Sequence, residues 1–595
     1  MHLASLHLEH FRGFRRLSLA LDPTTVLIGE NSCGKTSILD AIRLALSEEI
    51  LLADPPLGPL DFHVATDGPA TEAPPPLRIR LAFEELSPGE WPHAVVERLR
   101  GAIRPLGDGR HTVVLEIEAT REDDPSTPQR ATTKVAFLDP QQRPIDLDAP
   151  SVHRELRALK PVFQLGPNRP TWRGAIATGP RDGPLGRESG AGVVGAATPS
   201  SAGRRDVVAV AAPAQPATAV DATRLAQKLV ELYAALLDPR VEIGRFEESL
   251  AEVGALLALD REEEAIVSRS PDRLIEVVRH RLATIMAGRE IALAFGRHGA
   301  GTRAVLMFLL FASLLAGSGG RGLDPLAHPL LALEDPEAHL HPSLVAFIGR
   351  MLSGIRAQKL IVTHSGDVLA DAALPTIRRL SRRGDEVRSW RLRRSSLTGD
   401  DLGKVSYHIQ AKRGVVLFAR CWLLVEGETE FWLLPALARE LGYSLHLEGV
   451  ECVEFAQCGI VPLVKLADDL GIEWHVLADG DRAGEVYEHT ASEWLRGAAR
   501  ERRITALEAP DIEHCLWNNG FAPIYRRAAR LAVRGDGRRR GEVAGMVIAR
   551  AIKNTSKPHL ARMAIEHVRE AGPSGVPPPL RRAIETAVAL ARDAR

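Results

Sequence analysis

Gly29-Glu30-Asn31-Ser32-Cys33-Gly34-Lys35-Thr36 is the stretch that decides the fold of the first part of the chain. It matches the pattern G-x-x-x-x-G-K-[ST], a glycine-rich loop whose backbone N–H groups wrap around phosphates. Such a loop needs a strand before it and a helix after it. The sequence offers both, because Val26-Leu27-Ile28 is an apolar strand and residues 37–46 are typical of a helix. A glycine-rich turn without a ligand is the alternative interpretation.

Each position of this loop has an expected task. Lys35 would neutralise the β- and γ-phosphate oxygens of ATP, and the Thr36 hydroxyl would bind Mg²⁺. The positive end of the following helix adds a further attraction for phosphate. The residues expected to contact the nucleotide in this loop are Gly29, Asn31, Gly34, Lys35, Thr36 and Ser37.

Two later apolar strands end in residues that suit the same site. Residues 330–333 run into Glu334 and Asp335, which suit a metal contact and a base that positions the attacking water. Residues 360–363 run into His364, which is then placed where it could sense the γ-phosphate. The alternatives are a solvated strand end for the two acids and a structural role for the histidine.

The rest of the chain divides into α/β segments and an insertion. Residues 3–8 and 17–21 predict a hairpin, with a third strand at 25–28. From about 170 to 220 the chain is rich in Gly, Ala, Pro, Ser and Thr, a composition that cannot repay the entropy of folding. The predicted segments are 1–165, the N-terminal part of an ATPase head; 166–287, a flexible linker and helical insertion; 288–395, the C-terminal part of the head; 396–414, a linker; and 415–595, a second α/β domain.

A second group of carboxylates follows two apolar strands in the last third of the chain. The run 421–425 ends at Glu426, and the run 474–478 ends at Asp479-Gly480-Asp481. Because the carboxyl ends of parallel strands meet at one crevice, these acids are expected to lie together. Hard oxygen ligands bind Mg²⁺ or Mn²⁺, and two such ions can activate water and stabilise the leaving oxygen of a phosphodiester. Acidic loop residues without a metal are the alternative.

The motifs of the first half resemble those of the SMC/ABC class of ATPases. The resemblance rests on Phe11-Arg12-Gly13-Phe14, the phosphate loop, Gly299-Ala300-Gly301-Thr302-Arg303, Glu334-Asp335-Pro336-Glu337-Ala338-His339-Leu340-His341-Pro342 and Thr363-His364-Ser365. It implies that the run containing Gly301 lies before a helix and caps ATP bound to the other subunit of a homodimer. Related proteins usually have a second glutamate at the place of Asp335, which implies slow hydrolysis here. No long heptad segment separates the two parts of the head, which argues against a true SMC protein.

The second half resembles a Toprim domain, and the whole is similar to the OLD (overcoming lysogenization defect) family of ATP-dependent endonucleases, including its Gabija-like anti-phage members. The resemblance covers roughly 1–165, 280–375 and 415–560. It implies that the Toprim metal ligands are Glu426, Glu430, Asp479 and Asp481, with Glu513 as a further acid. It also implies a late lysine that stabilises transition-state charge; Lys557 is the choice, with Lys553 as the open alternative.

The composition limits the class of protein and its expected location. The chain has 595 residues and a net charge of -1, with 45% hydrophobic and 25% charged residues, which is typical of a globular protein of several domains. No apolar window reaches the roughly 18 residues of a membrane span, and the start lacks a signal peptide, so a cytoplasmic protein is expected. Five scattered cysteines predict neither a disulfide framework nor a zinc ribbon. Seven arginines between residues 525 and 540 are either a DNA-backbone contact or a solvated surface.

These features predict an α/β fold: an ABC/SMC-type P-loop ATPase with a helical insertion, followed by an α/β Toprim domain. The predicted function is that of a homodimeric ATPase and Mg²⁺- or Mn²⁺-dependent DNA endonuclease, in DNA processing or anti-phage defence. Its expected partner is DNA, and the resemblance to Gabija-like nucleases also implies a superfamily-1 helicase encoded nearby. The alternative is a non-nucleolytic SMC-like clamp or repair ATPase with a vestigial Toprim domain. A topoisomerase or primase is disfavoured, since the five tyrosines stand in no topoisomerase context and the cysteines form no zinc ribbon.

Overall fold

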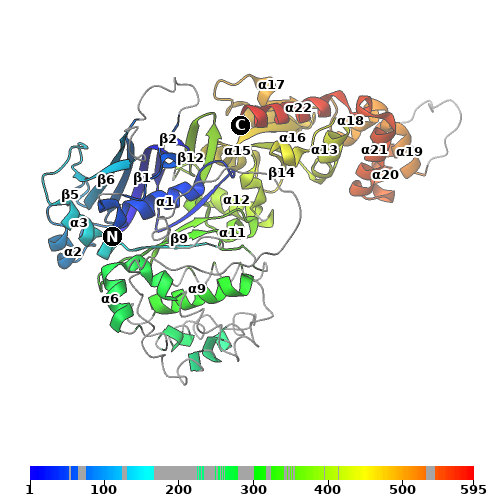
Figure 1. Cartoon of the computed structure of the whole chain (residues 1–595). Coiled ribbons are helices and arrows are strands. Elements are labelled where there is room, and N and C mark those ends of the chain that lie inside the picture. The colour runs from blue at the N-terminus through cyan, green and yellow to red at the C-terminus, as the bar shows by residue number, and fades with distance from the viewer. Residues whose placement is uncertain are drawn as a thin grey trace, which may run out of the picture. The chain divides into compact units, whose positions relative to one another are not determined.

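The computed structural model describes most of the chain and is shown in Figure 1. The described residues are 1–52, 55–64, 75–122, 130–166, 261–278, 300–316, 323–338, 355–393, 395–412, 414–530 and 543–594, with shorter pieces of 224–259 and 340–352. The chain forms two compact units. The first comprises Met1–Pro167, Ser268–Asp272 and Leu323–Arg595, and the second comprises Asn168–Val267 and Arg273–Gly322.

An antiparallel sheet forms the start of the first unit. Its strands are β1 (His2–Phe11), β2 (Phe14–Ala20), β4 (Leu77–Glu84), β5 (Arg104–Pro105), β6 (His111–Glu122) and β7 (Arg130–Leu138). They are ordered β2-β1-β4-β6-β5, and β7 pairs with β6. Every second residue of β4 is buried, as expected for a sheet with one face on the core. The predicted hairpin is confirmed, because β1 and β2 pair antiparallel around the turn at Arg12 and Gly13.

A second sheet carries the phosphate loop. It is ordered β12-β11-β3-β10-β9-β8, with strands β3 (Thr24–Gly29), β8 (Val162–Leu165), β9 (Leu330–Glu334), β10 (Gln358–Val362), β11 (Ile377–Arg383) and β12 (Glu386–Trp390). Only the pair β11–β12 is antiparallel. Strand β10 is buried along its whole length, as central parallel strands are. The third predicted strand, β3, thus belongs to a different sheet from the hairpin before it.

A third sheet lies in the C-terminal half and is entirely parallel. Its order is β14-β13-β15-β16, from strands β13 (Cys421–Val425), β14 (Val450–Glu454), β15 (Glu473–Ala478) and β16 (Ile504–Ala506). Strand β13 is fully buried. Helix α22 (Pro578–Asp593) has a buried apolar stripe, including Leu580, Ile584 and Val588, that belongs to the same core as β13.

Helices fill the rest of the first unit. They are α1 (Lys35–Ala45), α2 (His93–Arg98), α3 (Ala149–Leu159), α11 (Gly366–Asp371), α12 (Gly399–Ala411), α13 (Glu428–Glu440), α14 (Leu445–Glu448), α15 (Ile460–Asp469), α16 (Arg482–Ser492), α17 (Arg500–Arg503), α18 (Ile512–Leu516), α19 (Ala522–Ala528), α20 (Ala544–Asn554) and α21 (Lys557–Ala571). Helix α1 begins two residues earlier than predicted. The stretch 396–414, predicted as a linker, contains helix α12, whose start is capped by the Thr398 side chain.

The second unit is helical where it is described. Leu225, Leu229 and Leu232 lie in helical segments and are buried, in keeping with the predicted helical insertion. Helix α9 (Ala300–Ala316) lies in this unit, and α6 (Arg261–Arg269) crosses from it into the first. Gly301 was expected before a helix, but it lies in the first turn of α9 instead. The predicted flexible stretch 170–220 lies outside the described residues.

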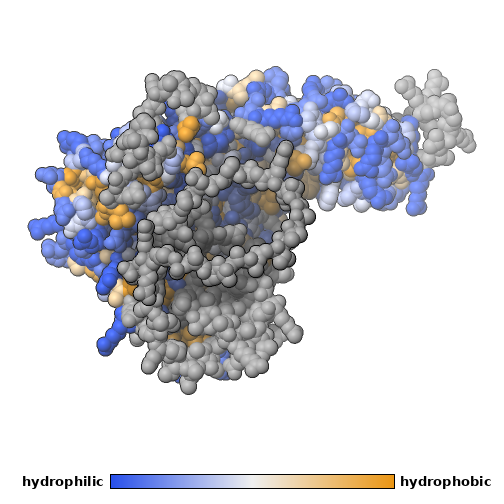
Figure 2. All heavy atoms as spheres, viewed as in Figure 1, coloured by the Kyte–Doolittle hydropathy of each residue, from blue (hydrophilic) through white to orange (hydrophobic). Residues whose placement is uncertain are grey.

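The exposed surface and the cysteine side chains of the described residues agree with what the composition predicts. On the face drawn in Figure 2, hydrophilic residues cover most of the described surface of the C-terminal helices. Within the described ranges, no helix combines the length and apolar character that crossing a bilayer requires. The five cysteines are free and buried: Cys33, Cys421, Cys452, Cys458 and Cys515.

Candidate functional site

A cavity of about 380 Å³ lies over the phosphate loop. Its walls come from the turn between β1 and β2, the loop and start of α1, and the ends of β9, β10 and β11. The lining residues are Gly13, Asn31, Ser32, Gly34, Lys35, Thr36, Ser37, Glu334, Asp335, Val362, His364 and Arg382. The structure therefore brings together most of the predicted nucleotide residues. Gly29, the last residue of β3, and Gly301, in the second unit, are not part of this lining.

The phosphate loop is shaped by close packing against the N-terminal turn. Gly34 is the N-cap of α1 and has φ 78°, a left-handed conformation that favours glycine. A Cβ at this position would lie 2.5 Å from Cζ of Phe14, so a side chain is also excluded by contact. The Lys35 ammonium donates hydrogen bonds to the carbonyl oxygens of Gly29, at 2.6 Å, and Glu30, at 2.9 Å. Burial lowers the pKa of Lys35 from its ordinary value.

The predicted metal residues of this pocket contact each other. The Thr36 hydroxyl donates a hydrogen bond to the Glu334 carboxylate at the end of β9. Asp335 follows with φ 44°, and its Oδ1 is buried without a hydrogen-bond partner. Burial raises the pKa of Asp335, and the nearby carboxylates of Glu337 and Glu334 raise it further. This carboxyl group is thus held in a strained backbone conformation beside the loop, where a charged or polar ligand would satisfy it.

Glu337 lies next to the nucleotide pocket, and the sequence motifs alone assigned it no role. Its Oε1 accepts hydrogen bonds from the Thr363 hydroxyl, at 2.6 Å, and from the backbone N–H of His364, at 3.1 Å. The pKa of His364 is lowered by burial first and by the charge of Lys35 second. Glu337 therefore joins the loop after β9 to the end of β10 and fixes where His364 stands at the pocket.

Arg382 is the second residue of the pocket that sequence reasoning missed. It lies near the end of β11 and donates to two loop carbonyls, from Nε to Ser32 O at 3.2 Å and from Nη2 to Gly13 O at 2.9 Å. The only signal in the sequence was a basic stretch from residue 378 onward, and 65 of the 75 basic residues of the chain are arginine. One arginine among so many gives no signal by itself.

The second group of carboxylates gathers at the ends of two paired strands. β13 and β15 are neighbouring parallel strands, so Glu426 and Asp479 leave the same edge of the sheet. Burial raises the pKa of Asp479 to about 8, and the charges of Glu430 and Glu426 add to the rise. Burial likewise raises the pKa of Glu430 to about 7, with Glu513 adding to it. Like charges crowded in a buried place favour a bound cation.

The outer members of this group are held by helix ends. Asp481 is the N-cap of α16, and its Oδ1 accepts a hydrogen bond from Gly484 N at 2.7 Å. The residue between the two aspartates must be small, since a Cβ on Gly480 would lie 2.3 Å from Leu507 O. Asp511 caps α18 in the same way through His514 N, and its charge raises the pKa of Asp479. Asp511 is a further acid here that the motif reading did not single out.

A lysine lies beside this group of carboxylates. Lys557 Nζ lies 3.1 Å from Glu513 Oε1. Lys553, four residues earlier at the end of α20, is exposed like Lys557 but has no ion pair among the contacts described. Burial alone would lower the pKa of Lys557, but the ion pair with Glu513 raises it above its ordinary value. Of the two candidate lysines, the structure therefore places Lys557 at the carboxylates.

These residues are suited to a divalent cation, although they do not enclose one as they stand. Within the described ranges, no group of three or more His, Cys, Asp and Glu side chains is arranged so that it could hold a metal ion. Oε2 of Glu426 is buried and has no hydrogen-bond partner, and burial raises the pKa of this carboxyl too. An unsatisfied carboxylate oxygen among other acids is an expected starting point for an oxygen-ligand site that closes around its ion.

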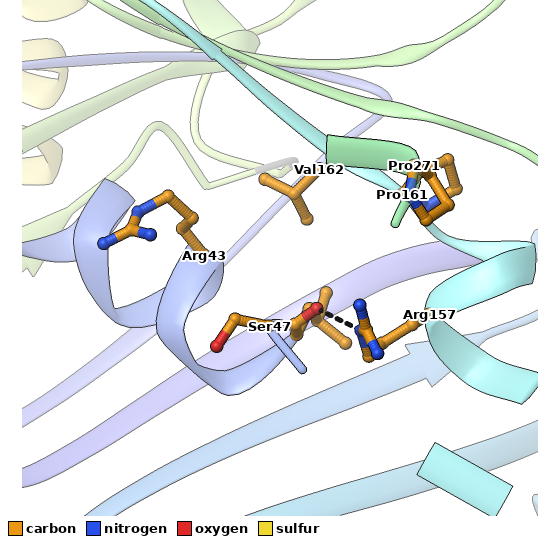
Figure 3. Close-up of a pocket in the computed structure, with 7 residues that line it drawn as sticks. Arg43, Ser47, Arg157, Pro161, Val162 and Pro271 are labelled. Carbon is orange, nitrogen blue, oxygen red and sulfur yellow. Dashed lines mark hydrogen bonds between the residues drawn. The ribbon is translucent and has the colours of Figure 1, made fainter. Parts of the chain in front are cut away.

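Among the described residues, the predicted arginine-rich stretch and a second, small cavity contribute nothing to either site. Of the arginine-rich stretch 525–540, residues 531–540 lie outside the described residues. A small cavity of about 10 Å³ at the far end of α1, lined by Arg43, Ser47, Arg157 and Pro271 among others, has room for about one water molecule (Figure 3). There Arg157 Nε donates to Leu46 O at 3.0 Å, which serves the packing of α3 and not a ligand.

Comparisons with known proteins cover nearly the whole chain. A family model described as "Protein of unknown function (DUF2813)" matches residues 1–184 and 218–416, and one described as "Overcoming lysogenization defect protein-like, TOPRIM domain" matches 417–481. The uncharacterized protein YbjD of Escherichia coli is 34% identical over 594 residues, which is 97% of this chain and 96% of that protein. A DNA replication and repair protein RecF of Synechococcus is 51% identical over 45 residues, 7% of this chain and 12% of that protein.

Among solved structures, two kinds of protein are similar to different parts of the chain. The C-terminal region of the Burkholderia pseudomallei OLD protein covers 29% of this chain and 99% of its own, with 18% identity and a TM-score of 0.25. The SMC head domain from Thermotoga maritima covers 66% of this chain and 100% of its own, with 13% identity and a TM-score of 0.30. The predicted α/β class and the C-terminal Toprim domain are confirmed by the sheets described above and by the second family model.

Proposed function

This chain belongs to the family described as proteins of unknown function (DUF2813) and carries a Toprim domain like that of the overcoming lysogenization defect protein, and on this premise we propose that it is an ATPase and a metal-dependent DNA endonuclease. The observation that carries the proposal is the presence of two separate acidic sites in one unit. One lies under a phosphate loop, where Thr36 contacts Glu334. The other is the buried carboxylate group around Asp479.

In the proposed ATP site, the residues of the chain bind and orient the nucleotide. With ATP bound, Lys35 would exchange its loop carbonyls for phosphate oxygens, and Thr36 and Glu334 would hold Mg²⁺. Asp335 orients the attacking water, and its raised pKa favours accepting a proton from that water. His364, fixed through its backbone by Glu337, faces the terminal phosphate. The side chain of Asp335 is shorter than a glutamate, so we expect slow hydrolysis.

In the proposed nuclease site, the carboxylates would hold two divalent ions, Mg²⁺ or Mn²⁺. Glu426, Glu430, Asp479, Asp481 and Glu513 would supply the oxygen ligands, and the raised pKa values of Glu430 and Asp479 reflect how unfavourable their crowded negative charges are without a cation. Ions bound there would lower the pKa of water and stabilise the leaving oxygen of a phosphodiester. Lys557 adds a positive charge beside Glu513 for the charge that develops on the phosphate.

The proposal extends to the partners. The substrate is DNA, and the active form is a homodimer in which the run with Gly301 caps ATP bound to the partner. We also propose that the chain works with a superfamily-1 helicase encoded nearby, in DNA processing or anti-phage defence. These statements rest on the resemblance to OLD proteins and on the Toprim match.

The alternative is a clamp or repair ATPase with a vestigial Toprim domain. The acids argue against it, because a vestigial site has no reason to keep Glu426, Asp479 and Asp481 together with a paired lysine. A decay of the site would first replace the costly buried carboxylates of the group, Glu430 and Glu513.

One experiment separates the two functions. Purified protein is incubated with supercoiled plasmid and Mg²⁺ or Mn²⁺, with and without ATP, beside an Asp479→Ala variant purified in the same way. Metal-dependent nicking or linearisation by the wild type and none by the variant supports the endonuclease. ATP hydrolysis without any cleavage by either protein, in both metals, contradicts it and favours the clamp.

A further inference from the structure

Strand β11 presents its arginines alternately to two sides. Arg378 and Arg382, on one side, contact the N-terminal part of the ATPase: Arg378 Nε donates to Ala20 O at 2.9 Å, and Arg382 donates to the phosphate loop. Arg379 and Arg383, on the other side, contact residues of the Toprim half. This division follows from the period of two along a strand. One strand therefore contacts both the nucleotide pocket and the third sheet.

On the pocket side, the Arg382 guanidinium is built into the phosphate site. It is half-buried, lines the cavity with Lys35 and Thr36, and is bound to two neutral carbonyl oxygens, of Ser32 and Gly13. A Cβ on Gly13 would lie 2.9 Å from Nη2 of Arg382, so a glycine permits this approach. A planar fork of donors prefers phosphate oxygens to neutral carbonyls, because charge-assisted hydrogen bonds are roughly twice as strong.

On the Toprim side, Arg379 is fully enclosed and satisfied by backbone. Its guanidinium donates to the carbonyl oxygens of Leu470, at 3.1 Å, Gly471, at 3.0 Å, and Ala419, at 2.8 Å. These residues lie two or three positions before the starts of strands β15 and β13. Such a contact leaves little freedom for β11 to move without the starts of both strands.

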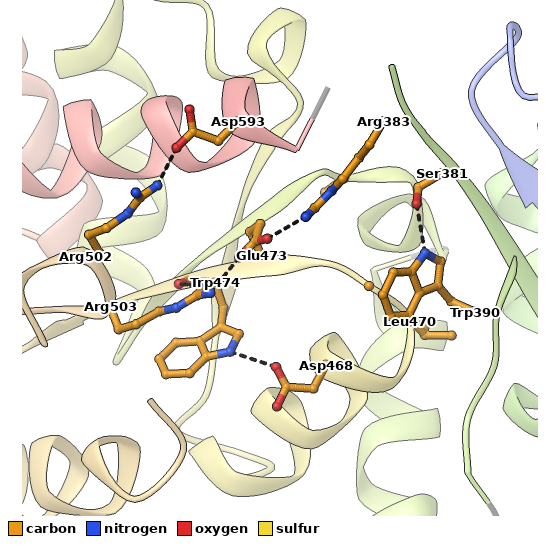
Figure 4. Close-up of polar contacts among 12 residues, drawn as sticks. Ser381, Arg383, Trp390, Asp468, Leu470, Glu473, Trp474, Arg502, Arg503 and Asp593 are labelled. Atoms are coloured by element: carbon orange, nitrogen blue, oxygen red, sulfur yellow. Dashed lines mark hydrogen bonds and ion pairs between the residues drawn. The ribbon is translucent and has the colours of Figure 1, made fainter. Parts of the chain in front are cut away.

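A second contact on this side reaches β15 itself. Arg383 forms an ion pair with Glu473, the first residue of β15, at 2.8 Å (Figure 4). The Trp390 ring of β12 packs on Gly471, where a Cβ would lie 2.3 Å from the ring. The indole N–H of Trp390 donates a hydrogen bond to Ser381 Oγ at 2.8 Å. The strand that Glu473 begins ends immediately before Asp479.

The phosphate loop also has its own direct contact with the third sheet. Arg420 donates to the carboxylate of Glu30, inside the loop, and lies immediately before β13, the strand that ends at Glu426. The two strands that carry the Toprim acids are thus joined to the phosphate loop at their starts, one through β11 and one through Arg420.

We propose that Arg382 is a phosphate-contacting residue of the nucleotide pocket and that β11 carries its change of partner to the starts of β13 and β15. When ATP is bound, the guanidinium leaves Ser32 and Gly13 for the polyphosphate, and the opposite face of the strand shifts with it. This inference rests on the proposed nucleotide binding. It adds the residue through which bound ATP would affect the Toprim strands.

The test measures ATP affinity and backbone protection in the full-length protein. ATP is titrated into the wild type and into Arg382→Gln, Arg382→Lys and Arg388→Gln. Arg388 lies on β12, is exposed, pairs only with Glu386 among the contacts described, and serves as the matched control. We expect the dissociation constant to rise about tenfold for Arg382→Gln, less for Arg382→Lys, and to stay unchanged for Arg388→Gln. Hydrogen exchange at 419–425 and 470–478 should change on ATP addition in the wild type and much less in Arg382→Gln at saturating ATP.

Each result has a definite meaning. Equal affinities for the wild type and Arg382→Gln overturn the phosphate contact. Weaker binding with an unchanged exchange response at saturation overturns the role of β11. If the wild type itself binds no ATP, the proposed ATPase function fails, and the inference fails with it. Circular dichroism of each variant identifies a folding defect, and the graded effect of Arg382→Lys then decides between lost charge and lost structure.

Discussion

Lys557 Nζ lies 3.1 Å from Glu513 Oε1, so the first residue of α21 forms an ion pair with a buried acid of α18. Glu513 is 4% exposed and also accepts a hydrogen bond from Thr429, at 3.4 Å. A half-exposed lysine thus holds its ammonium at a buried carboxylate of the acidic group around Asp479. This contact favours Lys557 over Lys553 as the candidate for the role that the sequence left open between them.

We expect Lys557→Gln to reduce DNA cleavage by about a hundredfold, because a positive group aimed at developing charge is worth about that much. Lys553→Gln, its matched control, should stay within about twofold of the wild type. Initial rates of plasmid nicking at saturating Mg²⁺ provide the measurement. Equal losses in the two variants would count against the special position of Lys557.

Asp481 has two tasks that different substitutions separate. Asn retains the N-cap of α16 but removes the charge that binds a cation, so Asp481→Asn should keep the melting temperature and lose cleavage. Asp481→Ala should lose cleavage and about 1 kcal/mol of stability as well. Thermal unfolding and cleavage assays in Mg²⁺ and Mn²⁺ check both. Wild-type cleavage by Asp481→Asn would remove this residue from the metal site.

Lys35→Ala should abolish ATP binding and leave the Toprim metal site intact. Lys35 is bonded only to the carbonyls of its own loop, Gly29 and Glu30, among the hydrogen bonds described, and contacts none of the acids around Asp479. Calorimetric titrations with ATP and, separately, with Mn²⁺ would test this. A folded variant that has lost both kinds of binding contradicts two independent sites.

Mixed dimers test the capping of ATP by the partner. Lys35→Ala and Gly301→Glu subunits should each be inactive as ATPases alone, and mixing them should restore up to about a quarter to a half of the activity, since one composite site is intact in each mixed dimer. Dimer formation is verified first by light scattering and differently tagged subunits. No recovery in verified mixed dimers would exclude a site shared between subunits.

Lys160 makes stability depend on pH. It is fully buried, its ammonium lies 3.1 Å from Met1 O and 3.1 Å from His328 Nδ1, and burial lowers its pKa to about 7. Between pH 7 and about 10.5 the unfolded chain keeps this proton and the folded chain has released it. Stability from this group therefore rises with pH in that window, by up to about 1.4 kcal/mol per pH unit.

The Lys160→Met variant lacks this titration. Relative to the wild type, it should be most stable near pH 6 and lose that advantage steadily toward pH 9, as followed by urea unfolding. Lys404→Met, on the exposed side of α12, is the control and should show no such trend. A constant difference between Lys160→Met and the wild type across this range would show that Lys160 titrates normally.

The sequence by itself predicted both candidate sites because their chemistry is local. The phosphate loop, the acids after β9 and those after β13 and β15 each follow an apolar strand, and the ends of parallel strands meet without further information. The hairpin and the strands β3, β9 and β10 of the second sheet were predictable for the same reason, from short-range alternation and apolar runs. The order of the motifs along the chain was also enough to predict an ATPase head followed by a Toprim domain.

Only the tertiary structure decided which basic and bridging residues belong to those sites. Arg382 enters the nucleotide pocket through the pairing of β11 with β3, which joins residues more than 300 positions apart in the chain. Glu337 reaches Thr363 and His364 because β9 and β10 are paired. The ion pair of Lys557 with Glu513, which favours Lys557 over Lys553 as the candidate, depends on how α21 packs, which no periodicity reveals. Long-range contacts of this kind depend on the summed burial of many side chains, so the type of a single residue does not predict them. Arginine is an especially weak signal in this chain, which has 65 arginines.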